Sequence, residues 1–453
     1  MEGSDVLHVE ICQNIDSMLS TQAIEDLVYA EINTLNDVAL DTIMYGKDLT
    51  NSILQIHVDS IICTCSHGER SHMKIQGATL KFHVYRLTTE SAATETMKND
   101  DEDIPASSHW MLPAQEFHHL WESLYFDCNI KENVGQTICL TFYNSLIIFY
   151  KLLHFVETAM IFADHNVDTN IISWNKVVLL YGPPGTGKTS LCKALAQKAI
   201  IRLGNRFAYG ELVEINSHSL FSKWFSESGK LVMKLFSEIK TLLENPQALV
   251  CILIDEVESL AHARKSCSNG AEPTDSIRVV NALLTQLDQI KRYPNILILT
   301  TSNLSQAIDL AFVDRADIKQ YIGHPTYQAI YKIYASCLKE LMRVNKHPYF
   351  LQFLRYAIPV CFLQTKLMEP EEIYDLSMLK KMGYEETPQS KCSLKLMELS
   401  QESMGLSGRV LRKMPFLAHA FYLRTKKCTL SRFLRAMHLA IEREKENNTQ
   451  EGF

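Results

Sequence analysis

A glycine-rich loop that follows a short apolar strand constrains the fold of this chain more than any other feature. Residues 177–190 read VVLLYGPPGTGKTS, which fits the pattern G-x-x-x-x-G-K-[ST]. Glycines let the loop turn successive backbone N–H groups toward phosphate oxygens, and the helix that follows aims its positive end at the same anion. We therefore predict a strand, a phosphate-binding loop and a helix that together bind a nucleoside triphosphate.

The polar residues of this loop have separate expected roles. Lys188 is expected to reach the β- and γ-phosphates, and the Thr189 hydroxyl to ligate Mg²⁺. The other predicted nucleotide-binding residues are Gly182, Pro183, Pro184, Gly185, Thr186, Gly187 and Ser190. A chance match or a surface Gly-Pro turn is the alternative, but the flanking strand and helix are the context that the motif requires.

Two later strands end in polar residues. ALVCILIDEVESL (248–260) is a continuous apolar run ending in Asp255 and Glu256, as expected for a buried parallel strand. We predict that Asp255 holds Mg²⁺ through water and that Glu256 polarises the attacking water. NILILTTSN (295–303) ends in Asn303, which is placed to orient water against the γ-phosphate. The alternative for Asp255 and Glu256 is a buried strand followed by an ordinary helix cap.

Strands that end in GKT, DE and TSN, in that order, resemble the AAA+ ATPase family. AFVDRADIKQYIG (311–323) is similar to the family's arginine-finger segment, with Arg315 as the finger, and GLSGR (405–409) is similar to its sensor-2 segment, with Arg409 as the sensor. Arginine suits both roles because its guanidinium stays charged and contacts phosphate bidentately. A surface salt bridge for Arg315 and a helix cap for Arg409 are the alternatives.

The segment NSHSLFSKWFSESGKLV (216–232) narrows the resemblance because it carries Lys223, Trp224 and Phe225. Protein-remodelling members of the family place an aromatic pore loop there to grip an extended polypeptide. A buried Trp-Phe pair is the alternative, and the Ser, Lys and Ser-Glu-Ser neighbours favour an exposed loop. Together with EPTDSIRVVNALLTQLDQIKR (272–292) and GLSGRVLRKMPFLAHA (405–420), the chain resembles the pachytene checkpoint protein 2 family, also called the thyroid receptor-interacting protein thirteen family.

This resemblance implies a homohexamer that binds ATP and Mg²⁺ and in which Arg315 of one subunit completes the site of the next. It implies that the ring converts HORMA-domain proteins from a closed to an open state, together with a HORMA-type adaptor. It also implies roles in disassembly of the mitotic spindle checkpoint complex and in meiotic recombination, synapsis and chromosome axis control. The implied locations are the nucleus and cytoplasm, at chromosomes and kinetochores.

Two other functions remain as alternatives. The first is a nucleic-acid motor or clamp loader. The aromatic loop disfavours it, and so does the net charge of −7, since nucleic-acid binders usually carry a basic face. The second is a nucleotide-dependent scaffold with little turnover, which the complete set of catalytic residue types disfavours. We therefore predict no direct contact with nucleic acid and, from the absence of a signal-peptide pattern in MEGSDVLHVE and of long apolar runs, no contact with a membrane.

A chain of 453 residues is expected to hold two or three domains. We predict an N-terminal α+β domain for adaptor and substrate at residues 1–87, an acidic solvated linker at 88–108, a large doubly wound α/β ATPase domain at 109–323 and a small helical lid domain at 324–453. Docking of a basic partner is the alternative role for the acidic run. Twelve scattered cysteines indicate reduced thiols, and the spacing of Cys63, Cys65, His67 and His72 matches no common zinc motif.

Two segments do not fit this layout. Residues 134–151 and 344–364 are rich in aromatic and β-branched residues and interrupt helical patterns. Our hypothesis is that both are retained introns, and a lineage-specific insertion loop is the alternative. The hypothesis predicts that both segments form loops or helix extensions outside the ATPase core, with exposed aromatic side chains.

Overall fold

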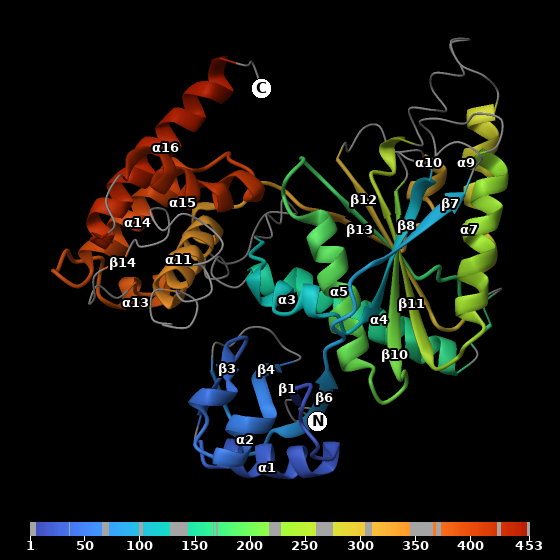
Figure 1. The fold of residues 1–453 in the computed structure, drawn as a ribbon, viewed down its shortest axis with the longest axis horizontal. Coiled ribbons are helices and arrows are strands. Elements are labelled where there is room, and N and C mark those ends of the chain that lie inside the picture. The colour runs from blue at the N-terminus through green and yellow to red at the C-terminus, as the bar shows by residue number, and fades with distance from the viewer. Residues whose placement is uncertain are drawn as a thin grey trace. The chain divides into compact units, whose positions relative to one another are not determined.

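The computed structural model resolves the chain into two compact units (Figure 1). The first contains Met1–Glu122, Cys128–Gly182 and Lys188–Ile322, and the second contains Ser123–Asp127, Pro183–Gly187 and Gly323–Phe453. Within these units the structure describes residues 6–35, 37–65, 72–98, 103–126, 144–165, 167–168, 171–216, 228–259, 275–303, 310–344, 366–367, 373–423 and 427–450. None of the helices in the described residues is both long enough and apolar enough to cross a membrane.

The N-terminal part of the first unit is a small α+β fold. Its four-stranded sheet has the order β3-β4-β1-β6, in which β1 pairs antiparallel with β4 and parallel with β6. The elements are β1 (Val6–Gln13), α1 (Thr21–Asn33), β2 (Asp37–Ala39), β3 (Ile43–Tyr45), α2 (Ser52–His57), β4 (Val58–Cys65), β5 (His72–Lys74) and β6 (Thr79–Arg86). Ile24, Val28 and Ile32 of α1 pack on this sheet, because their spacing puts them on one face of the helix.

A seven-stranded sheet forms the rest of the first unit, with the order β13-β9-β12-β11-β10-β8-β7. The five strands from β13 to β10 run parallel, and β8 and β7 are antiparallel to their neighbours. The strands are β7 (Ala93–Lys98), β8 (Asp103–Leu112), β9 (Val177–Tyr181), β10 (Tyr209–Asn216), β11 (Ala248–Asp255), β12 (Ile296–Ser302) and β13 (Ile318–Tyr321). This confirms the predicted α/β class with a mostly parallel sheet.

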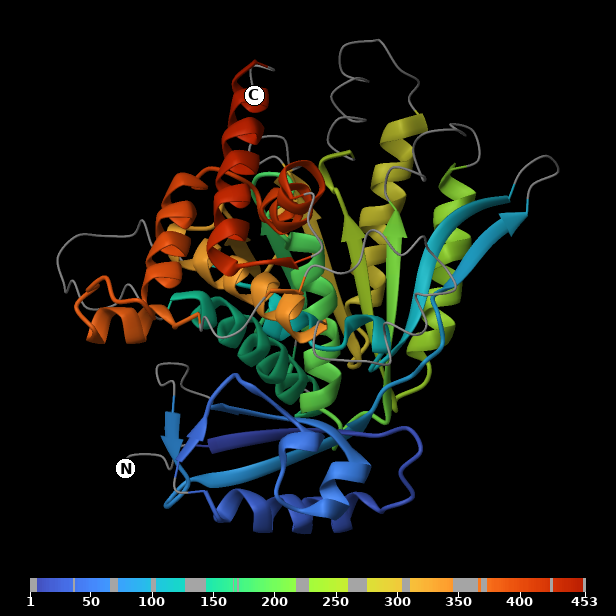
Figure 2. The same ribbon diagram turned by 60° about the vertical axis from the view of Figure 1, so that its left-hand side comes forward.

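Helices cover both faces of this sheet (Figure 2). One face packs against α7 (Ser228–Leu243) and α9 (Asp275–Ile290), and the other against α5 (Lys188–Arg202). Since both faces are covered, the central strand β11 is apolar along almost its whole length and is buried from Ala248 through Ile254.

The prediction of a solvated linker over residues 88–108 is wrong where β7 and β8 form. These strands pair with each other, and β8 also pairs with β10, so the seven-stranded sheet begins before residue 109. The sequence ATETMK of β7 is polar because β7 lies at the edge of the sheet. Charged side chains are common on edge strands, where they discourage pairing with other chains.

The segment 134–151 is also packed more closely than we predicted, as far as it is described. Its last residues begin helix α4 (Asn144–Asp164), in which Ile148 and Phe149 are buried. The Phe149 ring lies 4.4 Å from that of Trp121, and the Tyr150 hydroxyl donates a hydrogen bond of 2.9 Å to Asp41. The prediction of exposed aromatics is therefore wrong for these residues. Residues 134–143, and 345–364 of the second segment, lie outside the described residues.

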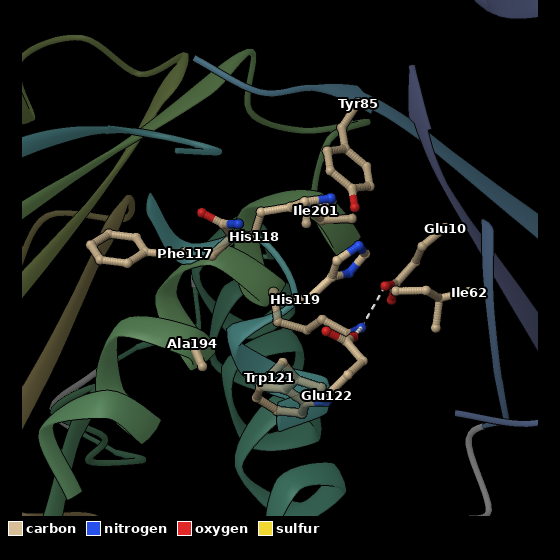
Figure 3. Close-up of a pocket in the computed structure, with 12 residues that line it drawn as sticks. Glu10, Ile62, Tyr85, Phe117, His118, His119, Trp121, Glu122, Ala194 and Ile201 are labelled. Atoms are coloured by element: carbon tan, nitrogen blue, oxygen red, sulfur yellow. Dashed lines mark hydrogen bonds and ion pairs between the residues drawn. The ribbon is translucent and has the colours of Figure 1, made fainter. Parts of the chain in front are cut away.

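A buried ion network joins the N-terminal fold to helix α5. The Glu10 carboxylate on β1 accepts hydrogen bonds from Lys198 and from Arg202 Nε, the latter at 2.7 Å, and Lys198 also reaches Glu122 at 2.9 Å. Glu10, Lys198 and Arg202 expose 1%, 4% and 3% of their side chains. Burial alone would raise the pKa of Glu10, but the two cations lower it to about 2. Glu10 and Glu122 both line the pocket drawn in Figure 3.

The second unit is helical, as we predicted for the lid. Its main elements are α11 (Tyr327–Val344), α13 (Leu376–Lys381), α14 (Lys391–Glu402), α15 (Gly408–Tyr422), α16 (Leu430–Gln450) and the paired short strands β14 (Lys366–Leu367) and β15 (Lys427–Cys428). Tyr334 of α11 is fully buried, and its hydroxyl lies 2.8 Å from Ser403 Oγ. Ser407 caps α15 by accepting a hydrogen bond from the Val410 N–H.

Candidate active site

The glycine-rich loop has the backbone conformation that its glycines allow. Gly182, Gly185 and Gly187 have φ angles of +149°, +72° and +94°, which residues with a Cβ rarely adopt. A Cβ at Gly182 would also lie 2.0 Å from the carbonyl oxygen of Ile322. The loop is therefore specified by its glycines, as the motif predicts.

Helix α5 starts directly at Lys188, whose Nζ donates a hydrogen bond of 3.0 Å to the Gly182 carbonyl. The first turn of α5, which includes Thr189 and Ser190, contains no acidic residue. The partial positive charge at this helix N-terminus is therefore not offset by a carboxylate of the same turn, which suits an anion such as phosphate. The residues present fit a bound nucleoside triphosphate.

The middle of the loop, Pro183–Gly187, groups with the second unit, where it contacts the start of α15. The backbone N–H of Arg409 donates a hydrogen bond of 3.0 Å to the Gly185 carbonyl. A Cβ at Gly185 would lie 2.8 Å from Ser407 Oγ, so glycine is required for this approach as well. Since Ser407 is the cap of α15, the alternative role of Arg409 as a cap does not apply.

Asp255 lies at the carboxyl end of β11, beside the start of α5. The Thr189 hydroxyl donates to the Asp255 carboxylate, at 2.9 Å from Oδ1 and 3.2 Å from Oδ2, and the Thr301 hydroxyl donates to Oδ1. Hydroxyl and carboxylate oxygens are ligands that Mg²⁺ prefers, so the pair fits a magnesium ion held together with nucleotide. We had not singled out Thr301, although it lies in the same TTSN sequence as Asn303.

Glu256 adopts a left-handed backbone conformation, with a φ of +57°. Its N–H donates to Thr301 Oγ1 at 3.2 Å, and its carboxylate accepts a hydrogen bond of 3.3 Å from Asn303 Nδ2. Non-glycine residues at positive φ are strained and cluster at functional sites, where the surrounding structure holds them. The structure thus brings Glu256 and Asn303 together at the edge where strands β11 and β12 end.

Glu258 contacts the backbone of Asn303. Its Oε1 accepts a hydrogen bond of 3.1 Å from the backbone N–H of Asn303, and the residue is only 9% exposed. Its position three residues after Asp255 in DEVE gave no signal that distinguished it from a surface glutamate. We infer that Glu258 fixes the backbone that carries Asn303.

Arg315 forms a bidentate ion pair with Asp288 of α9. Its Nε and Nη2 donate to the Asp288 carboxylate oxygens at 3.1 and 2.7 Å. Burial alone would raise the pKa of Asp288, but hydrogen bonds from Arg315 and Lys291 outweigh it and lower that pKa. The Arg315 side chain is 29% exposed, so it is oriented by a residue of the same chain and remains accessible.

One set of predicted residues is not placed by these observations. Lys223, Trp224 and Phe225 lie outside the described residues.

Among the described residues, Lys188, Thr189, Asp255, Glu256 and Asn303 gather along the carboxyl edge of the parallel sheet. That edge is where ligands bind in open α/β sheets.

A parallel sheet with this loop, paired carboxylates at its edge and a helical lid define a P-loop ATPase of the AAA class. The family model described as "ATPase family associated with various cellular activities (AAA)" matches residues 178–324. The "TRIP13 N-terminal domain" model matches residues 2–90, and "TRIP13-like, AAA+ ATPase lid C-terminal domain" matches residues 326–445.

Similar full-length proteins specify the family. The chain is 46% identical to the pachytene checkpoint protein 2 homolog of Homo sapiens over 448 residues, which cover 98% of this chain and 94% of the relative. It is 51% identical to the homolog of Canis lupus familiaris over 444 residues, with coverages of 97% and 93%. A solved structure of C. elegans PCH-2 is similar with a TM-score of 0.71 and 29% identity, covering 97% of this chain and 99% of that one. The chain belongs to the pachytene checkpoint protein 2 (TRIP13) family of AAA ATPases.

Proposed function

We propose that the chain hydrolyses ATP in a homohexameric ring to convert HORMA-domain proteins from a closed to an open state. The observation that carries the proposal is the gathering of Lys188, Thr189, Asp255, Glu256 and Asn303 at one sheet edge in a chain of this family. That edge carries a phosphate-binding lysine, candidate ligands for Mg²⁺ and a candidate base for water, which are parts that phosphoryl transfer from ATP to water uses. Turnover, and not only nucleotide-dependent scaffolding, is the activity that this set supports.

Each residue has a part in this proposal. Lys188 and the loop backbone bind the phosphates, and Thr189 and Asp255 hold Mg²⁺, which neutralises charge on the phosphates when bound. Glu256 accepts a proton from the attacking water, and Asn303 positions Glu256 and that water. Arg315 serves the site of a neighbouring subunit, and Arg409 contacts the phosphates of its own subunit's nucleotide.

The substrate and setting are also proposed, and family membership supports them. A HORMA-type adaptor and its HORMA-domain substrate are received by the N-terminal domain. The outcomes are disassembly of the mitotic spindle checkpoint complex and control of meiotic recombination, synapsis and chromosome axes. The protein acts in the nucleus and cytoplasm, at chromosomes and kinetochores, without direct contact with nucleic acid.

Glu256→Gln tests the central claim. We expect the variant to bind ATP as well as the wild type, because Lys188 is unchanged, and to lose hydrolysis by about 10²-fold or more, because general-base catalysis is lost. In the presence of ATP the variant should bind a HORMA-domain protein with its adaptor, keep them bound and leave the HORMA-domain protein in its closed state. Phosphate release, ATP binding and the open fraction of the substrate are the measurements, with Lys188→Ala as the control that loses binding itself. Wild-type rates of hydrolysis in Glu256→Gln would remove Glu256 from its proposed role.

Trp224→Ala tests the proposed pore loop. The indole is expected to grip an extended chain through its large apolar surface, so substrate conversion should be lost while basal ATP hydrolysis persists. Rates of both processes in the same preparation give the measurement. If the variant instead aggregates with loss of both, the side chain is part of a core and the pore-loop assignment is wrong.

A further inference from the structure

Three metal-ligating side chains from distant segments meet outside the ATPase site. The Sγ of Cys12 on β1, a carboxylate oxygen of Asp59 on β4 and a ring nitrogen of His118, which follows β8, all lie within 4.8 Å of one another. His118 Nε2 and Asp59 Oδ2 are 3.1 Å apart. Among the described residues, no other group of three or more such side chains converges in this way.

A β-bulge directs Asp59 toward Cys12. In the antiparallel pair of β1 and β4, Cys12 lies opposite Ser60 and Gln13 lies opposite Val58, so Asp59 has no direct partner. In a regular strand the side chain of Asp59 would point to the face opposite that of Ser60 and Cys12. Bulges re-aim a side chain in this manner and are frequent beside functional sites.

The residue after His118 is also strained and partly buried. His119 has a φ of +55°, a strained conformation for a residue with a Cβ, and its ring lies against that of His118, tilted by 34° with centroids 3.6 Å apart. Both of its ring nitrogens are buried without a hydrogen-bond partner among the described residues. Buried polar atoms of this kind usually have a partner, which can be a water or an ion. His118, His119 and Tyr85 line one small pocket (Figure 3).

The chemistry of the three side chains selects the metal. Thiolate, imidazole and carboxylate together suit Zn²⁺, whereas Mg²⁺ and Ca²⁺ prefer oxygen ligands alone. Ligand atoms around one tetrahedral zinc lie roughly 3.5 Å apart. The ligand atoms of His118 and Asp59, 3.1 Å apart, already meet this separation, and all three atoms lie within 4.8 Å of one another, so binding needs only a small movement. The Asp59 side chain, 46% exposed, has room to make it. A hydrogen bond between the side chains of Tyr85 and Cys12 holds the sulfur in position.

We propose that Cys12, Asp59 and His118 form a zinc site in which water takes the fourth position. Cys12 and Asp59 belong to the N-terminal sheet, whereas His118 belongs to the segment between β8 and α4. The bound ion therefore joins the N-terminal fold to the ATPase part of the first unit. The ligands lie far apart in the sequence, which is why their spacing shows no motif.

Metal titration of the purified, nucleotide-free full-length protein tests the site. After treatment with a chelator, the wild type should bind one Zn²⁺ per chain, and Co²⁺ in its place should give a thiolate-to-cobalt charge-transfer absorption band. Cys12→Ser should abolish this band. Asp59→Asn should keep it but lower the zinc affinity about tenfold or more, the scale on which even outer-shell partners act. Cys337→Ser, which changes a partly exposed thiol of α11, is the matched control and should bind as the wild type does.

Two results would overturn the proposal. One is a wild-type protein that binds no zinc under these conditions. The other is a charge-transfer band that persists in Cys12→Ser, which would place the metal on a different cysteine. Because Asp59 is half exposed, Asp59→Asn is expected to fold, so unchanged zinc affinity in that variant would also count against the site even if Cys12→Ser were unstable.

Discussion

At the scale of single residues, the ATPase site combines strain with close hydrogen bonding. Glu256 is held in a left-handed conformation by the bond between its N–H and Thr301, and its carboxylate is contacted by Asn303. Glu258 in turn binds the backbone of Asn303. The position of the proposed base is thus fixed by Thr301 on β12 and by Asn303 just after it, as pre-organised catalysis requires.

Arg315→Ala is expected to abolish hydrolysis while leaving nucleotide binding intact. Arginine fingers contribute on the order of 10³–10⁵ to the rate of phosphoryl transfer. Mixing Arg315→Ala with Lys188→Ala subunits should restore part of the activity, because each can complete a site that the other lacks. Asp288→Asn should reduce the rate less, since the guanidinium stays charged but loses its bidentate anchor. If Arg315→Ala hydrolyses ATP at the wild-type rate, the pair with Asp288 is only a surface salt bridge.

At the scale of elements, helix α4 shows that part of the unusual segment belongs to the fold. The burial of Ile148 and Phe149 and the bond from Tyr150 to Asp41 place the start of this helix between Trp121 and the N-terminal fold. A retained intron offers no reason for such contacts. A lineage-specific insertion, the alternative to the retained intron, explains these residues better if it is packed as a helix and not as a loop.

Tyr150→Phe tests this packing. Burial raises the pKa of Asp41, and the Tyr150 hydroxyl is the partner that offsets the cost of its buried carboxylate. Removal of the hydroxyl should destabilise the protein by about 1–3 kcal/mol, the range for a buried group that loses its hydrogen bond. Thermal unfolding is the measurement, and Tyr29→Phe, at a tyrosine that is half exposed, is the matched control. Equal melting temperatures for both variants would show that the start of α4 is not packed as described.

The sequence was sufficient to predict those elements in which the local pattern of apolar residues agrees with their burial. The apolar runs of β9, β11 and β12 and the glycines of the loop were predicted where the structure has them. Lys188, Thr189, Asp255 and Glu256 lie at the carboxyl edge of those strands, and their catalytic roles stay predictions. The polar strand β7 was missed because an edge strand needs no apolar alternation. Thr301, Glu258 and Asp288 were missed because their roles depend on contacts between segments far apart in the sequence.

At the scale of the whole molecule, the ion network around Glu10 connects the first strand of the chain to the helix that begins with Lys188. Buried charges of this kind are strongly destabilising when one partner is removed, because the remaining charge has no compensation. Glu10→Gln should therefore lower the melting temperature near pH 6, through a loss of about 3–5 kcal/mol.

The same variant gives a pH dependence with a definite sign. Because the folded-state pKa of Glu10 is about 2, below its ordinary value of 4.5, its charge stabilises the protein fully above about pH 4.5. That stabilisation is lost as the pH falls from about 4.5 through 2. The difference in melting temperature between wild type and Glu10→Gln should thus shrink as the pH is lowered from 6 toward 3. A difference that stays constant over this range would mean that folding does not lower the pKa of Glu10.

Helix α5 is partly enclosed by the N-terminal sheet, which matters when the protein is divided into fragments. Lys198 and Arg202 are covered by β1 and β4, so a fragment that starts after residue 87 would leave Arg202 without Glu10 and Thr64, and Lys198 with Glu122 alone, on newly uncovered apolar surface. Such a fragment is prone to aggregate, and inactivity in it would not show that the N-terminal domain takes part in catalysis. Domain-swapped chimeras that retain β1 and β4 are the informative way to separate substrate reception from ATP hydrolysis.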